Sequence, residues 1–190
     1  VSHLERHLRA VKKLKNIHFT VVNGENAAMV GLTPNDAERI FSAGADVITL
    51  GNHTFGKMQI TDYLDDCPYI LRPHNLGARV PGRGYGVFDC GRARIAVMNL
   101  IGRCDLAFHA DNPFKTADEL LKSGEKPTFT LLDFHAEATS EKLAMAYYLD
   151  GRVSAIWGTH THVPTADEEV IPIGTGYIPD IGMTGAGRSV

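Results

Sequence analysis

Apolar residues recur along this chain at two spacings, and segments of the two kinds alternate. Leu4, Leu8, Val11 and Leu14 recur at helical spacing, which predicts an amphipathic helix at the start of the sequence. The apolar run at 19–22 lacks that spacing and indicates a buried strand that ends in a polar loop. The chain is therefore expected to open with a helix followed by a strand.

The same alternation continues toward the far end. Thr33 and Pro34 form an N-cap and first-turn pair, and Gly44 is expected to end the helix that they begin. Thr139 or Ser140 is expected to cap a later helix. Other helices are predicted at 58–64 and from 113 to about 124, and strands at 47–50, 69–71, 95–100, 129–132 and 153–157.

Strands that alternate with helices predict an α/β sandwich, with sheet in the middle and helices outside. A length of 190 residues suits one domain with a sizeable core. The chain begins without Met, and its Gly-rich stretch at 182–187 leads to no closing element. We therefore expect a single domain over 1–190 that is incomplete at both ends.

Composition narrows the function classes. The net charge is −3, which leaves no basic excess to hold a nucleic-acid backbone, so a small substrate is favoured over a long nucleic acid. Cys67, Cys90 and Cys104 form no C-x-x-C pair, which favours a reducing compartment. No apolar run approaches the roughly 20 residues that span a bilayer. These features predict a cytoplasmic protein without a membrane partner.

A set of polar residues falls just after the predicted strands. Ligand sites in open α/β sheets form at the carboxyl ends of strands, so these residues are expected to share one rim, together with Asn75 and Asn99. The set consists of Glu25, Asn26, Asn52, His53, His135, His160 and His162.

Each motif in this set also has a plainer interpretation. His160 and His162 in G-T-H-T-H can point the same way from an extended segment and bind a metal, or they can be exposed histidines of a polar loop. G-N-H at 51–53 can supply an amide ligand or be a turn, and N-G-E-N at 23–26 can supply a bridging carboxylate or be a solvated turn. His135 in D-F-H-A-E is either a ligand or a satisfied strand-end residue, and Glu137 there is interpreted as helix-start charge.

Taken together, a carboxylate, amides and histidines at successive strand ends suit a site for two transition-metal ions. Nitrogen and oxygen donors without Cys favour manganese, iron or zinc over calcium. Arg72 in R-P-H-N could hold a phosphate or pair with a carboxylate, and Asn75 follows it at the same predicted strand end.

The longer motifs resemble those of the calcineurin-like metallophosphoesterases, and within them the YmdB-like bacterial phosphodiesterases. The matching segments are N-G-E-N-A-A at 23–28, D-F-H-A-E-A-T-S-E-K at 133–142, G-T-H-T-H-V-P-T-A-D at 158–167 and D-I-G-M-T-G at 180–185. The resemblance covers nearly the whole chain. It implies a metallophosphoesterase-type α/β sandwich that hydrolyses 2′,3′- or 3′,5′-cyclic nucleotides or related phosphodiesters, and a protein that forms homo-oligomers.

The resemblance also implies roles for the set. Glu25 would bridge two metals, usually manganese or iron, with Asn52, His135 and His160 on one and His162, with Asn26, on the other. His53 would be the catalytic histidine near the leaving group, and Arg72 and Asn75 would contact substrate. The family's first strand, which ends in G-D-V-V-G and carries a metal-binding Asp, has no counterpart before the first helix here, and its C-terminal strands are also expected to be missing. One metal site would be crippled if the sequence were complete.

Other functions fit the same pattern. The same metals could serve a phosphomonoesterase or nucleotidase, because the shape of the pocket selects the substrate. A metal-binding regulatory protein without turnover, or a plain α/β domain with polar loops, is a further alternative.

Overall fold

The structure is a computed structural model, and it describes residues 1–106, 109–122 and 126–185. Within these ranges the strands form two sheets. The β1–β3 sheet is parallel and consists of β1 (Val21–Asn23), β2 (Val47–Thr49) and β3 (Ile70–Leu71). The β4–β9 sheet consists of β4 (Tyr85–Asp89), β5 (Arg94–Ile101), β6 (Phe129–His135), β7 (Ala155–Thr159), β8 (Glu169–Val170) and β9 (Gly176–Ile178).

The β4–β9 sheet has the order β4, β5, β6, β7, β9, β8. Its central strands β5, β6, β7 and β9 run parallel, and the outer strands β4 and β8 are antiparallel to their neighbours. The register places Ile101 beside His135 and His135 beside Thr159. The carboxyl ends of β5, β6 and β7 therefore lie level with one another.

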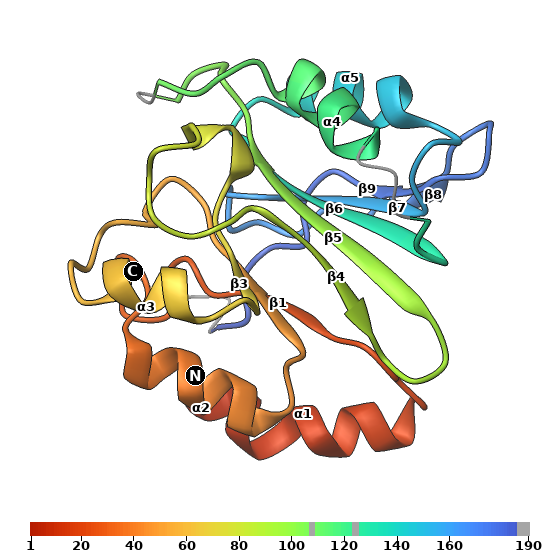
Figure 1. Ribbon diagram of the computed structural model, residues 1–190. Coiled ribbons are helices and arrows are strands. Elements are labelled where there is room, and N and C mark those ends of the chain that lie inside the picture. Colours follow the sequence, from red (N-terminus) through yellow and green to blue (C-terminus); the bar gives the residue numbers. More distant parts are fainter. Residues whose placement is uncertain (107–108, 123–125, 186–190) are drawn as a thin grey trace.

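Helices cover the outer face of each sheet (Figure 1). On the β4–β9 sheet lie α4 (Pro113–Leu121) and α5 (Thr139–Leu149). On the side of the β1–β3 sheet lie α1 (Ser2–Leu14), α2 (Pro34–Ala43) and α3 (Ile60–Asp66), and a short 3-10 turn spans His74–Leu76. The predicted α/β architecture, with sheet inside and helices outside, is confirmed.

Three apolar layers hold these elements together. Phe134 and Met145 belong to the layer between the β4–β9 sheet and α4 and α5, and Ile40 and Ile48 belong to the layer between the β1–β3 sheet and its helices. A third layer, with Val47, Leu71, Ile95 and Val97, lies between the sheets. Burying one such Ile, Leu or Phe side chain contributes about 1.5–3 kcal/mol. The layers therefore fix both sheets relative to each other.

Polar side chains also join the two sheets. The Asn99 amide on β5 is fully buried and donates to the carbonyls of Leu50 and Leu71, at 2.7 Å each. Asn99 was expected at the polar rim, and that prediction is wrong. The side chain lies inside because it gives the Leu50 carbonyl a donor and adds a second donor to the Leu71 carbonyl, which also accepts from the Leu50 amide at 3.0 Å.

The element boundaries contain further corrections. Thr33 and Gly44 cap α2 as predicted, the former by accepting from the Asp36 amide at 3.1 Å. Ala138, not Thr139 or Ser140, is the N-cap of α5, and no side-chain cap bond is found there among the described residues. The helix expected to end near position 124 ends at Leu121, and position 124 lies outside the described residues.

Strand β6 continues three residues beyond the predicted run, so that His135 is the last residue of a strand. The strand predicted at 153–157 is shifted to 155–159. Strands β8 and β9 were not predicted. No helix within the ranges that the structure describes combines the length and the apolar character needed to cross a membrane.

Candidate metal centre

The predicted set of polar residues converges where the carboxyl ends of the two sheets face each other. Loops after β1 and β2 supply one half of this cluster, and β6 with the loop after β7 supplies the other. Hydrogen bonds and ion-pair contacts link every member: Glu25, Asn26, Asn52, His53, His135, His160 and His162. These seven residues are called the cluster below.

The centre of the cluster is the Nε2 atom of His135, whose ring is fully buried. It lies 2.8 Å from the Asn52 Oδ1 atom, 3.1 Å from the His160 Nδ1 atom and 3.2 Å from the Glu25 Oε1 atom. These atoms come from four segments of the chain. An imidazole nitrogen can serve one such neighbour as donor or acceptor, so this crowding of lone pairs suits a cation.

The other ring nitrogen of His135 has a fixed partner. Its Nδ1 atom lies 2.9 Å from the Thr159 hydroxyl, and that hydroxyl donates its proton to the Asp133 Oδ1 atom at 2.8 Å. The hydroxyl can therefore only accept from His135, which assigns a ring proton to Nδ1 and, in the neutral ring that can bind a metal, leaves a lone pair on Nε2. Partners of this kind orient metal-binding histidines and set their tautomer.

Asp133 anchors this relay between the two sheets. Its Oδ2 atom accepts from Thr49 at 2.5 Å and from Asn23 at 3.1 Å, both of the β1–β3 sheet, whereas its Oδ1 atom accepts from Thr159 of the β4–β9 sheet, so that both sheets donate to one fully buried carboxyl group. Burial raises the pKa of Asp133, and the hydrogen bonds from these side chains and Thr159 oppose that rise. Because all three neighbours are donors, the ionised carboxylate is the form that its surroundings satisfy.

The turn after β2 fits against the same histidine. A Cβ atom at Gly51 would overlap the ring of His135, so the glycine lets Asn52 approach Nε2. The first position of G-N-H therefore needs glycine, because any side chain there would collide with the His135 ring.

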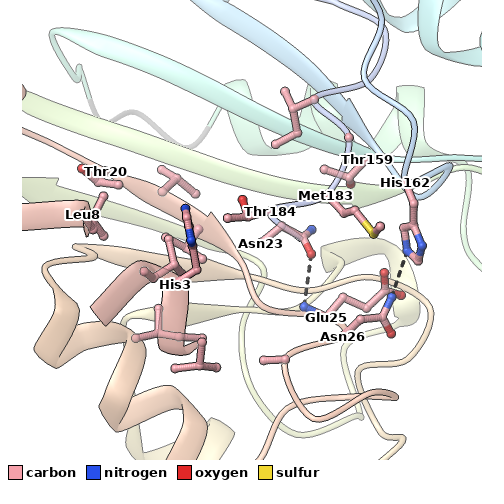
Figure 2. A pocket seen from close by; sticks show the side chains of 18 of the residues that line it. His3, Leu8, Thr20, Asn23, Glu25, Asn26, Thr159, His162, Met183 and Thr184 are labelled. Carbon is pink, nitrogen blue, oxygen red and sulfur yellow. Dashed lines mark hydrogen bonds between the residues drawn. The ribbon is translucent and has the colours of Figure 1, made fainter. Parts of the chain in front are cut away.

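Asn26 links two histidines from different sheets. Its Oδ1 atom lies 3.2 Å from His53 Nδ1, and its Nδ2 atom lies 3.0 Å from His162 Nε2. Figure 2 shows Asn26 and His162 pointing toward each other. This amide orientation gives His53 a proton on Nδ1 and leaves a lone pair on His162 Nε2.

Glu25 lies between His135 and His53. Its Oε1 atom accepts the backbone N–H of His53 at 3.0 Å and lies 3.5 Å from the His53 ring. Burial works to raise the pKa of Glu25, but the contacts with His135 and His53 outweigh it and lower the pKa below its usual range. The carboxylate is therefore ionised near neutral pH. His53, with 40% of its side chain exposed, and His162, which is also exposed, form the open end of the cluster.

His160 and His162 adopt uncommon backbone conformations, with φ of 113° and 65°. Such conformations cost about 1–3 kcal/mol each and persist where the surrounding structure imposes them. Burial, followed by the nearby His135, lowers the pKa of His160, which favours the neutral ring that can bind a metal. Its Nε2 atom lies 3.0 Å from Glu137 Oε2, so Glu137 is a neighbour of the cluster, not only helix-start charge.

A cavity of about 430 Å³ borders the cluster (Figure 2). Glu25, Asn26, His160 and His162 line one part of it. Apolar and polar side chains, most of them from α1, β1 and the segment 181–184, line the rest. Among the described strands, β1 pairs with β2 alone, so the cavity lies along the free edge of β1.

Arg72 and Asn75 lie outside the cluster's hydrogen-bond network. The Arg72 guanidinium is buried and donates to backbone carbonyls of its own loop, those of Pro73, His74, Gly77, Val80 and Pro81. The Asn75 side chain donates to the carbonyls of Ile101 and Asp111 and accepts from the Ile101 amide. These contacts give both residues a structural role, and contact with substrate stays a prediction for them.

The donor set fits a transition metal better than a hydrogen-bond network. The lone pairs of His135 Nε2 and Asn52 Oδ1 face each other at 2.8 Å, with the Glu25 carboxylate beside them. Acceptors in that arrangement repel each other unless a cation lies among them. Within the described ranges, no three His, Cys, Asp or Glu side chains are arranged to enclose an ion by themselves, so a metal site in the cluster would also have to use the amide of Asn52.

Two sheets packed between helices, with carboxylate, amide and imidazole donors gathered at their strand ends, define an α/β domain of the metallophosphoesterase type. The chain belongs to the YmdB-like protein family, whose family model matches residues 1–190.

Individual relatives agree with this assignment. The chain is 51% identical over 170 residues to the 2′,3′-cyclic-nucleotide 2′-phosphodiesterase of Bacillus subtilis (strain 168), and the match covers 88% of this chain and 64% of that protein. The crystal structure of a hypothetical protein from Thermus thermophilus has a TM-score of 0.93 at 38% identity, and the match covers 100% of this chain and 73% of that one. The crystal structure of a novel phosphatase from Mycoplasma pneumoniae has a TM-score of 0.88 at 37% identity, covering 96% and 66%. The chain thus spans about two thirds of the length of these relatives.

Proposed function

We propose that this chain carries the metal-binding core of a phosphodiesterase that hydrolyses cyclic nucleotides, 2′,3′-cyclic nucleotides foremost. The observation that carries the proposal is the convergence of Asn52, His160 and Glu25 on the Nε2 atom of His135. The substrate class is supported by the activity for which the Bacillus subtilis relative is named, since that protein shares half of the aligned residues.

Two transition-metal ions, manganese or iron with zinc as a further possibility, would bind in the cluster. Glu25 would bridge the two ions, with Asn52, His135 and His160 on one and His162 and Asn26 on the other. Such ions supply positive charge at a phosphoryl group and lower the pKa of a bound water toward neutrality. The ionised Glu25 and the neutral His160 are the protonation states that this role needs.

His53 would act as the general acid at the leaving oxygen. The Asn26 and Glu25 oxygens both face its Nδ1 atom and keep a proton there, so Nε2 is the atom that can exchange a proton with substrate. Its exposure gives substrate access to this ring. General acid catalysis of this kind contributes about 10²–10⁴-fold to the rate.

A phosphomonoesterase is the second candidate, because the Mycoplasma pneumoniae relative is named a putative phosphatase/phosphodiesterase. Both reactions use the same donor set, so the choice depends on the pocket around it. Metal-binding regulation without turnover is a third outcome. Assembly into homo-oligomers and a cytoplasmic location stay predictions.

Elemental analysis of the full-length protein, combined with a substrate panel, tests this function. The expected result is bound manganese or iron, with turnover of 2′,3′-cyclic AMP exceeding turnover of AMP. Faster turnover of AMP would favour the phosphomonoesterase, and bound metal without turnover of either would favour the regulatory protein. Absence of any transition metal would contradict the whole proposal.

Glu25→Ala tests the assignment of the bridge. Loss of both metal and activity is expected together, because no other cluster member offers a carboxylate between His135 and His53 within the described residues. Glu119→Ala is the matched control, because that carboxylate is exposed on α4 and makes a weak 3.9 Å pair with Lys115. Wild-type turnover in Glu25→Ala would contradict the assigned role.

A further inference from the structure

The backbone that carries His160 and His162 requires an external constraint. Both residues have positive φ values, which are uncommon for residues with a side chain. Thr161, the residue between them, makes contacts that fix the segment from one side. Its backbone N–H donates to the Asp180 Oδ2 atom at 3.2 Å, and its hydroxyl donates to the same atom at 2.8 Å.

Asp180 is fixed in turn by the elements around it. Its Oδ1 atom accepts from the Gly182 amide at 2.8 Å, and its backbone N–H and C=O face Thr165. The segment around Asp180 is also tied to β7, because the Ile181 amide donates to the Gly158 carbonyl at 3.0 Å. The Asp180 carboxylate is therefore a fixed acceptor for the backbone N–H and the hydroxyl of Thr161.

Lys142 supplies the opposite charge from α5. Its Nζ atom donates to Asp180 Oδ2 at 2.8 Å, and both side chains are almost fully buried, with 2% and 3% exposed. Gly158 permits this approach, because a Cβ atom there would overlap the Pro179 carbonyl and lie 2.8 Å from the Lys142 Cδ atom. Burial opposes ionisation of Asp180, but its contacts with Lys142, Gly182 and Thr161 lower its pKa.

None of these residues belongs to the cluster. The chain nevertheless places a buried lysine on the core face of a helix, where an apolar side chain would pack without the cost of burying a charge. Removing the aspartate would release both bonds from Thr161 and leave the lysine unpaired. The arrangement therefore ties the conformation of residues 160–162 to one ion pair.

We propose that Asp180, paired with Lys142, is a positioning residue that holds His160 and His162 at the spacing needed for metal binding. The inference rests on the proposed function, because it concerns the same metal centre. It assigns to Asp180 and Lys142 an action through Thr161, not direct contact with metal or substrate.

Mn²⁺ binding to the full-length, metal-free protein tests the inference. Lys142→Met and Asp180→Asn are expected to weaken Mn²⁺ binding about 10–100-fold, the range found when groups behind metal ligands are removed. Turnover should recover at saturating Mn²⁺, because the ligands themselves remain. A purely structural loss would lower the melting temperature without this recovery.

Lys12→Met is the matched control. Lys12 also pairs with a carboxylate that accepts a backbone N–H, since Asp46 Oδ2 lies 2.7 Å from both Lys12 Nζ and Thr20 N. This pair lies on the α1 side, outside the cluster, and its loss should leave Mn²⁺ affinity within about twofold while lowering stability. An equal loss of affinity in Lys12→Met would overturn the inference, because general destabilisation would then explain both.

If Lys142→Met and Asp180→Asn fail to fold, Thr161→Val tests whether the contact between Asp180 and Thr161 supports metal binding. It keeps the Lys142–Asp180 pair and removes one donor to Asp180, so a rise in the Mn²⁺ dissociation constant near the low end of the same range, about 10-fold, is expected. Folded variants that bind Mn²⁺ like the wild type would overturn the inference and leave the proposed function standing. A wild-type protein that binds no Mn²⁺, iron or zinc would instead overturn the proposed function, and the inference with it.

Discussion

The two sheets contribute to the same cluster in different ways. From the β4–β9 sheet come His135, which is fully buried and oriented by the buried Thr159, His160, which is partly buried, and His162, which is exposed. From the β1–β3 sheet come short loops whose outermost residue, His53, is 40% exposed. A site that binds ions and then transfers a proton to substrate needs both properties, rigid ligands on one side and an accessible acid on the other.

The comparison also shows where the fixing groups come from. Asp133 collects hydrogen bonds from Asn23 and Thr49 of one sheet and from Thr159 of the other. The orientation of His135 therefore depends on the carboxylate of Asp133, which is fully buried and lies away from the open rim. Variants should separate the fixing carboxylate from the accessible histidine, because changes at Asp133 should affect stability and metal binding, and changes at His53 should affect turnover.

Asp133→Ala is expected to have the largest effect. Each buried donor left without an acceptor costs about 1–3 kcal/mol, so the loss of three partners should lower the free energy of unfolding by roughly 3 kcal/mol or more. Metal affinity should fall as well, because His135 loses the relay that sets its tautomer. Urea unfolding and Mn²⁺ titration measure the two effects. Asp65→Ala is the control, since that exposed carboxylate accepts one amide bond, from Gly82.

His53→Ala should change the reaction and leave the fold intact. Loss of a general acid is expected to lower kcat by about 10²–10⁴-fold. Bound metal should stay at the wild-type level, and stability should change by about 0.5 kcal/mol or less, because the side chain is partly exposed. The loss should be greatest for substrates with poor leaving groups. Loss of metal in this variant would mean that His53 is a ligand.

Gly51→Ala tests the contact between the halves. The added methyl group would overlap the His135 ring, and overpacking of this kind costs about 1–3 kcal/mol. Metal binding should weaken because the ring must move away from Asn52. Gly176→Ala is the matched control, because its Cβ atom would meet neighbours at 3.7 and 3.8 Å, which is ordinary contact. Equal effects in both variants would contradict the steric argument.

Lowering the pH should have the smallest effect on stability. Burial lowers the pKa of both His160 and His74 below 6.5, so the unfolded chain takes up protons first as the pH falls through that value. The metal-free protein is therefore expected to be most stable above pH 6.5 and to lose stability below it, by at most about 1.4 kcal/mol per pH unit for each proton. His160→Gln should reduce this slope, and thermal unfolding between about pH 5 and 8 measures it.

The sequence was sufficient to predict the cluster because its members follow strand ends. A strand end is visible as a change from apolar to polar residues, and parallel strands bring such ends to a common edge. The fixing groups carry no such signal. Asp133 lies inside an apolar run, and its partners Asn23 and Thr49 are 110 and 84 residues away in sequence. Lys142 occupies the buried face of α5, where its charge alone would have suggested exposure.

Arg72 has a structural role that the sequence did not reveal, and its contact with substrate stays a prediction. Its position after β3 made it a candidate for phosphate binding, but the guanidinium is buried among carbonyls of its own loop. A loop of this shape leaves several carbonyls without amide partners, and a single guanidinium can satisfy many of them. Such a role depends on the path of the loop, which local sequence does not reveal.

Helix α1 forms one wall of the cavity beside the cluster, and the charged contacts of α1 make this wall sensitive to ionic strength. None of its described residues is fully buried. Leu4 packs against the apolar layer of the β1–β3 sheet, and charged side chains supply further contacts: Glu5 with Arg39, Arg9 with the Ser42 carbonyl, and Lys12 with Asp46. Exposed charge pairs are screened by salt, whereas the apolar layers behind the opposite wall are not. Ionic strength should therefore loosen the wall formed by α1 selectively, and with it widen access to Glu25 and Asn26.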